Sequence, residues 1–225
     1  MASNTGLRAS VGQRALFITS FAVPLTGWTV HAVTLHRRLQ AARRDPLTGL
    51  HGRDGYTARA QQLTVRHPGD AMIVMVDLDR FKQINDTRGH AVGDRVLAVT
   101  ARRLTDWAGS HGTVGRLGGD EFALAVRIAP AYQLLRLAHL AALLAEPVPV
   151  AGESVVDVAA SIGAATPNRL ATTDLALLQR AADTALYEGK HSGRAMVAGP
   201  RHTTAASING RRAGRPGAST WGHAA

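Results

Sequence analysis

The sequence predicts an α/β sandwich, in which helices cover a mixed β-sheet. Its 225 residues suit one domain of ordinary size with extensions, and 45% of them are hydrophobic, which is enough for a packed core. Helical and strand patterns alternate along the middle of the chain, as they do in α/β domains. One β-hairpin interrupts this alternation, so we expect a mixed sheet rather than a purely parallel one.

The first half of this middle section begins with a turn at residues 45–49, DPLTG, where Pro46 fixes the backbone. A helix is predicted over 53–65, and the apolar run AMIVMV at 71–76 predicts a buried central strand. Apolar residues at helical spacing then predict a helix over 94–107, for which Asp94 is a suitable N-cap.

The second half contains the hairpin. Two apolar stretches flank Gly118-Gly119, and this pattern predicts a hairpin over residues 113–126. The remaining patterns predict a helix, a strand, a second helix and a last edge strand, over 132–144, 154–165, 175–190 and 195–198.

The chain carries a formal net charge of +10, with 26 basic and 16 acidic residues. Residues 1–44 hold six arginines and no acid, and residues 196–225 hold four arginines and no acid. The excess charge therefore lies in the flanks, whereas residues 45–195 are neutral. Because a nucleic-acid-binding domain needs a basic surface, we expect no nucleic-acid partner. The absence of cysteine excludes disulfides, thiolate metal ligands and a cysteine nucleophile.

The N-terminal flank, residues 1–35, contains a candidate transmembrane helix over 15–35. Its 21 residues include no charged side chain, although Pro24 and Gly27 dilute its apolar character. The basic linker 36–44, predicted as a helix, follows it, and the positive-inside tendency places this side in the cytoplasm. We therefore expect a single-pass protein of the cell inner membrane with a cytoplasmic folded domain.

The alternative for 15–35 is an amphipathic or buried helix, which would make the protein cytoplasmic. At the other end, residues 198–225 are rich in small and basic residues and predict a disordered basic tail.

Acidic residues follow two of the predicted strands. Asp77 and Asp79 end the apolar run, and Asp120 and Glu121 occupy the tip of the hairpin. Carboxylates at strand ends suit a hard divalent cation of the kind that assists phosphoryl transfer. The alternative is ordinary turn chemistry after two glycines.

A second group of polar residues, around Lys82, Asn85, His90 and Asp94, follows the first acidic pair. An Asn and an Asp together can read the donor and acceptor edge of a guanine, since Asp accepts from N1–H and N2–H₂. The alternative is loop and capping chemistry.

A third group lies near the C-terminal end of the helix predicted over 175–190. Lys190 and Arg194 are four residues apart and can converge on a polyphosphate, unless they only complement the helix dipole. Lys82 and Lys190 are the only lysines among 26 basic residues, which indicates that a compact ammonium is required at both positions.

Five segments in order resemble the GGDEF-domain diguanylate cyclase family. The resemblance extends over residues 45–197, with Gly52 where the family more often has Asn. The segments are DPLTGLHGR at 45–53, VDLDRFKQINDTRGHAVGDRVL at 76–97, RLGGDEFAL at 116–124, ASIGAA at 160–165 and AADTALYEGKHSGR at 181–194.

The resemblance implies a cyclase-type fold, an α/β sandwich with a central five-stranded mixed, mostly antiparallel sheet surrounded by helices. It implies condensation of two GTP into the bacterial second messenger cyclic di-GMP, with release of two pyrophosphates. A homodimer is then required, because one domain holds one GTP. The alternative is a catalytically silent nucleotide- or protein-binding module with the same fold.

The resemblance also implies roles for individual residues. Asp77, the carbonyl of Leu78 and Asp120 match metal ligands for two Mg²⁺ per active site, with Mn²⁺ as a substitute. Asp120 and Glu121 match the catalytic acids, either of which can deprotonate the 3′-hydroxyl. The positions that match GTP contacts are Lys82, Asn85, His90, Asp94, Gly118, Gly119, Lys190 and Arg194.

Overall fold

The computed structural model describes residues 28, 31, 44–150, 154–192 and 195–203. The candidate transmembrane segment 15–35 and the linker 36–44 therefore lie outside the described residues, apart from Trp28, His31 and Arg44. No helix within the described ranges combines the length and apolarity that a bilayer span requires.

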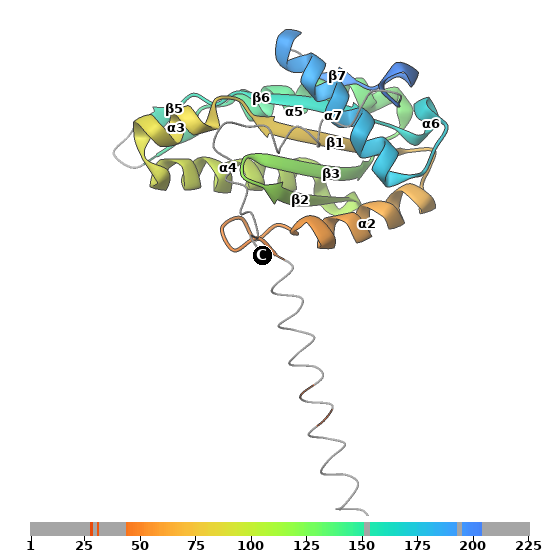
Figure 1. The fold of residues 1–225 in the computed structure, drawn as a ribbon, viewed down its shortest axis with the longest axis horizontal. Helices are drawn as coiled ribbons and strands as arrows, with labels where there is room; N and C mark the ends of the chain where they lie inside the picture. Colours follow the sequence, from red (N-terminus) through yellow and green to blue (C-terminus); the bar gives the residue numbers. More distant parts are fainter. Residues whose placement is uncertain (1–27, 29–30, 32–43, 151–153, 193–194, 204–225) are drawn as a thin grey trace, which may run out of the picture. The chain divides into compact units, whose positions relative to one another are not determined.

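The core of the domain is a five-stranded sheet with the strand order β2-β3-β1-β6-β7 (Figure 1). Strand β1 pairs antiparallel with both β3 and β6, β2 pairs antiparallel with β3, and only β7 is parallel to its neighbour. This confirms the mixed, mostly antiparallel sheet. The strands are β1 (Ala71–Leu78), β2 (Gly112–Gly118), β3 (Glu121–Arg127), β6 (Ala160–Ala165) and β7 (Met196–Val197).

Helices cover both faces of this sheet, with α2 and α7 in front of it and α4 and α5 behind it in Figure 1. Alternate β1 residues serve the two sides: Met72 and Val74 join the core under α4 and α5, whereas Ile73 and Met75 join the core under α2 and α7. The long helices are α2 (Arg53–Arg66), α4 (His90–Ala108), α5 (Gln133–Ala145) and α7 (Leu175–Ser192).

Short elements complete the domain. A separate two-stranded sheet joins β4 to β5. The short elements are α3 (Phe81–Arg88), α6 (Pro167–Leu170), β4 (Val148–Pro149), β5 (Val155–Val156), η1 (Gly109–His111), η2 (Pro130–Tyr132) and η3 (Pro200–Thr203).

The largest departure from the sequence prediction concerns the segment between β1 and α4. A separate helix, α3, forms there, and α4 begins at His90 rather than at Asp94. Gly89, with φ at +84°, makes the break between the two helices and occupies the N-cap position of α4. The prediction that Asp94 caps the helix was therefore wrong, because Asp94 lies inside α4.

Two other boundaries differ. The strand predicted over 154–165 is divided into β5 and β6. The ordered domain also continues beyond residue 197, where the disordered tail was predicted to begin at 198. Ala198 is fully buried, and the His202 side chain in η3 is 2% exposed. Residues 198–203 thus belong to the domain, because burial of these side chains holds them against it.

Candidate active site

The acidic residues predicted at two strand ends come together in the structure. Asp77 on β1 lies directly opposite Glu121 on β3 in the antiparallel register. One residue further, the backbone N–H of Leu78 donates a hydrogen bond of 3.2 Å to the carbonyl of Asp120. The end of β1 and the tip of the β2–β3 hairpin therefore form one site, although they are far apart in the sequence.

The hairpin turn depends on its two glycines. Gly118 and Gly119 have φ angles of +144° and +56°, which L-residues with side chains rarely adopt. A Cβ at either position would meet no atom within 4 Å. The requirement for glycine is therefore conformational, and it allows Asp120 and Glu121 to follow at the tip of a tight turn.

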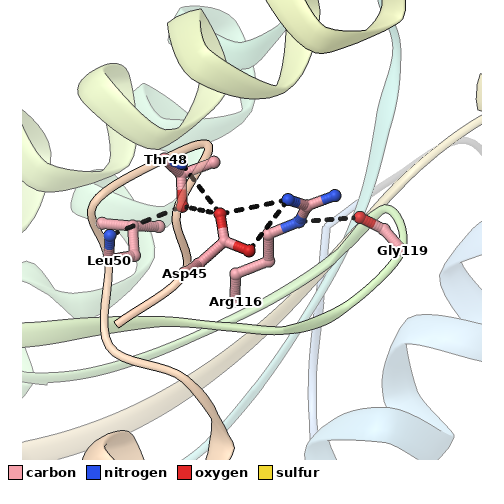
Figure 2. Close-up of polar contacts among 5 residues, drawn as sticks. All are labelled: Asp45, Thr48, Leu50, Arg116 and Gly119. Carbon is pink, nitrogen blue, oxygen red and sulfur yellow. Dashed lines mark hydrogen bonds and ion pairs between the residues drawn. The ribbon is translucent and has the colours of Figure 1, made fainter. Parts of the chain in front are cut away.

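The DPLTG turn holds this hairpin in place, as Figure 2 shows. The Asp45 carboxylate accepts hydrogen bonds from the Thr48 backbone N–H at 2.8 Å and the Thr48 hydroxyl at 2.6 Å. Nη1 of Arg116 lies 3.1 Å from both oxygens of the same carboxylate, and Nε donates to the carbonyl of Gly119 at 2.9 Å. The sequence analysis assigned no role to Arg116, which links the two motifs.

The charge state of Asp45 follows from these contacts. Burial by itself would raise the pKa of Asp45, but the hydrogen bonds from Thr48 and Arg116 and the Arg116 charge outweigh it. The pKa therefore lies below its ordinary value, and the carboxylate stays ionised beside the guanidinium.

The predicted guanine-reading pair lies where α3 packs against α4. A Cβ at Gly93 of α4 would be 1.9 Å from Oδ1 of Asn85, so only glycine allows this approach. Asn85 therefore packs against α4 at Gly93, the residue directly before Asp94. Asp94 and the neighbouring His90 are exposed on α4, and Lys82 is exposed on the first turn of α3.

Lys190 reaches from α7 to Asp77, the first of the predicted metal ligands. Its Nζ lies 2.7 Å from Oδ1 of Asp77, in an ion pair that joins residues 113 positions apart. Arg194, which the sequence analysis paired with Lys190, lies outside the described residues.

Asp183 is a site residue that the sequence analysis missed. Burial raises the pKa of Asp183, the negative charge of Asp77 raises it further, and Lys190 partly offsets both effects. Asp183 lies seven residues, or about two helical turns, before Lys190, so both side chains fall on one face of α7. That spacing was the available sequence signal.

Asp79 has a different environment from Asp77. Its Oδ1 accepts a hydrogen bond of 2.8 Å from the Ser161 hydroxyl, and its backbone N–H donates to the carbonyl of Ala159 at 2.8 Å. These contacts fix the segment after β1 to the start of β6, so Asp79 holds the end of β1, where Leu78 lies.

The donor atoms fit a hard divalent cation. The carboxylates of Asp77 and Asp120 and the carbonyl of Leu78 offer oxygen atoms, and Mg²⁺ usually takes one or two protein carboxylates with the rest from water and phosphate. Within the described ranges no cluster of three acidic, His or Cys side chains forms a ready-made metal site. Asp77 has the Lys190 ammonium at 2.7 Å, so a positive charge already lies beside this carboxylate.

A cleft of about 790 Å³ borders this site, with Asp79 and Lys190 in its lining. Residues of α3 and the segment 155–159 form its other walls. Asn85 and Asp94 do not line it. Asn85 is half-buried between α3 and α4, whereas Asp94 and His90 are exposed on α4.

The same architecture and motifs occur in known proteins. The family model described as "Diguanylate cyclase, GGDEF domain" matches residues 42–196. The chain belongs to the GGDEF diguanylate cyclase family.

Relatives from several bacteria match this part of the chain. Diguanylate cyclase DgcZ from Escherichia coli is 32% identical over 181 residues, which are 79% of this chain and 58% of DgcZ. An uncharacterized 19.3 kDa protein from Streptomyces ambofaciens is 48% identical over 172 residues, covering 76% of this chain and 91% of its own length. The chain thus spans somewhat more than half of DgcZ.

Solved GGDEF structures superpose on the described fold. The isolated GGDEF domain of TpbB from Pseudomonas aeruginosa matches with a TM-score of 0.63 and 33% identity, over 71% of this chain and 96% of that one. The coiled-coil and GGDEF region of DgcB from Caulobacter crescentus, solved with c-di-GMP, matches with a TM-score of 0.64 and 25% identity. That match covers 80% of this chain and 99% of the DgcB chain.

Proposed function

We propose that this GGDEF protein is an active diguanylate cyclase that condenses two GTP into cyclic di-GMP and releases two pyrophosphates. The observation that carries the proposal is the meeting of Asp77, Leu78 and Asp120 with Lys190 at one end of the sheet. Diguanylate cyclases among its relatives support it, as does the complete signature from Gly118 to Phe122.

The chain's own residues would bind and orient the nucleotide. Asp94 accepts hydrogen bonds from guanine N1–H and N2–H₂, and Asn85 pairs with N3 or N2. Lys82, Lys190 and Arg194 neutralise the phosphates. Asp77, the Leu78 carbonyl and Asp120 would hold two Mg²⁺, or Mn²⁺ in their place, which supply charge neutralisation at the triphosphate when bound.

The chemical step is a displacement at phosphorus. The 3′-oxygen of one GTP attacks the α-phosphorus of the other, and the bond to the bridging oxygen breaks so that pyrophosphate leaves with its electron pair. Asp120 or Glu121 takes the proton of the 3′-hydroxyl, and both lie at the hairpin tip beside Asp77. Two such steps close the ring.

We propose that the protein acts as a homodimer. One domain offers one set of guanine and phosphate contacts, and the reaction joins two nucleotides. Two domains related by a twofold axis would therefore face each other across the open surface that carries His90 and Asp94.

The test uses the full chain with GTP and Mg²⁺, and product is separated by chromatography and identified by mass. Cyclic di-GMP is expected from the wild type and not from Asp120→Asn, which keeps the side-chain shape but removes the charge. Light scattering shows whether each sample is dimeric. A dimeric wild type that binds GTP and forms no product would overturn the proposal and leave the silent binding module.

A further inference from the structure

The ion pair between Lys190 and Asp77 occupies the carboxylate that is expected to bind a cation. Nζ lies 2.7 Å from Oδ1, and the Asp77 side chain is only 12% exposed. A carboxylate this buried is costly unless a positive charge compensates it. In the described structure, Lys190 supplies this compensation.

The close packing of α7 on β6 makes this contact. A Cβ at Gly163 would lie 2.0 Å from the carbonyl oxygen of Ala182 and 2.4 Å from the backbone nitrogen of Leu186. The register places Ser161 of β6 opposite Asp77, two residues before Gly163. One turn after Leu186, Lys190 therefore lies within reach of Asp77.

We propose that Lys190 is the resident counter-cation of Asp77, and that a divalent ion binding at Asp77 releases the lysine ammonium to the triphosphate. The ammonium and the ion compete for the same oxygen, so the free enzyme binds the ion more weakly than it would without Lys190. The release to phosphate rests on the proposed function, whereas the competition at Asp77 does not.

The chemistry of lysine suits such a transfer. Its ammonium is a compact charge on a flexible four-carbon stem, and it can change acceptors by rotation of that stem. An arginine fork would be held by paired hydrogen bonds. This chain uses lysine at only two of its 26 basic positions, and one of them is Lys190.

The experiment measures Mn²⁺ binding to the full chain in the absence of nucleotide, by the loss of the free Mn²⁺ signal in electron paramagnetic resonance. Lys190→Met removes the charge and keeps most of the stem. A hydrogen bond to a charged group contributes roughly 1.5–3 kcal/mol, so Mn²⁺ should bind about tenfold or more tightly to this variant. Lys190→Arg keeps the charge and should stay near the wild-type affinity.

The chain offers a matched control in its other lysine. Lys82→Met removes the same charge from α3, at an exposed position, and should leave nucleotide-free Mn²⁺ affinity unchanged while it weakens GTP binding. Asp77→Asn should abolish the gain of Lys190→Met in the double variant, because the competition is for Asp77. Circular dichroism checks that each variant is folded.

Three Mn²⁺-binding results would contradict the counter-cation role of Lys190. Unchanged or weaker Mn²⁺ binding by Lys190→Met would overturn the proposal, as would a gain that persists with Asp77→Asn or an equal gain in Lys82→Met. A wild type that competes in this way but makes no cyclic di-GMP would refute the proposed activity and leave the counter-cation role standing. A wild type that makes cyclic di-GMP, in a protein whose Lys190→Met variant binds Mn²⁺ no more tightly, would refute the counter-cation role and leave the proposed activity standing.

Discussion

The Arg116 guanidinium bridges the Asp45 carboxylate and the hairpin turn, with Nη1 3.1 Å from both carboxylate oxygens and Nε 2.9 Å from the carbonyl of Gly119. The two residues lie 71 positions apart. The DPLTG turn, which begins the domain, thus sets the position of the turn that carries Asp120.

Asp45→Asn should therefore impair turnover although Asp45 is not among the proposed metal or nucleotide contacts. Loss of the ion pair lets the hairpin turn shift, and small misplacements of reacting groups cost roughly ten- to a hundredfold in rate. We expect a fall in kcat with little change in KM for GTP, measured by steady-state kinetics. The control is Asp70→Asn, which breaks an ion pair with Arg127 at the far end of β3. Equal losses in both variants would contradict a specific role for Asp45.

The same substitution gives a pH-dependent effect on stability. The folded-state pKa of Asp45 is lower than its ordinary value of 3.8, so its stabilisation is present above about pH 4 and is lost as the pH falls through the folded pKa. Thermal unfolding should show the wild type above Asp45→Asn at neutral pH, with the gap closing in acid. A gap that is constant from pH 7 to pH 3 would show that ionisation of Asp45 contributes nothing.

Gly93→Ala should impair guanine recognition without loss of stability. The new Cβ would be 1.9 Å from Oδ1 of Asn85, and the amide must rotate away. Loss of one hydrogen bond predicts a KM for GTP raised roughly tenfold, while alanine favours the helix by about 0.5–1 kcal/mol. In an Asn85→Ala background the substitution should have no further effect on KM. A further rise in KM for GTP on adding Gly93→Ala to Asn85→Ala would show that Gly93→Ala does not act through Asn85.

Gly163→Ala should destabilise the fold. Its Cβ would be 2.0 Å from a backbone carbonyl of α7, which cannot rotate away, so helix and sheet must separate. Overpacking of this kind costs roughly 1–3 kcal/mol in the free energy of unfolding. Denaturant titration measures it, with Gly69→Ala as the control because its Cβ would meet nothing within 4 Å. A Gly163→Ala protein as stable as that control would refute the close approach of α7.

We also propose that residues 15–35 anchor the protein in the membrane. Removal of residues 1–35 should then move the protein from the membrane to the soluble fraction, detected by immunoblot after high-salt washing. Full-length protein found only in the soluble fraction would refute the anchor and favour a cytoplasmic protein.

Much of the fold could be predicted because its signals are local. The apolar run of β1 and the two glycines of the hairpin can be recognised within a few residues of sequence. Strand burial and turn conformation depend on immediate neighbours. The break at Gly89 was missed because α3 is only eight residues long and has no buried residue, so it leaves little apolar pattern to detect.

The family, the signature and the residue types offered for metal, guanine and phosphate could all be recognised in the sequence. The contacts that join Arg116 to Asp45 and Lys190 to Asp77 are known only from the folded structure. Both contacts depend on strand register and on how closely α7 approaches Gly163. These are consequences of packing between segments far apart in the chain, and no local pattern encodes them.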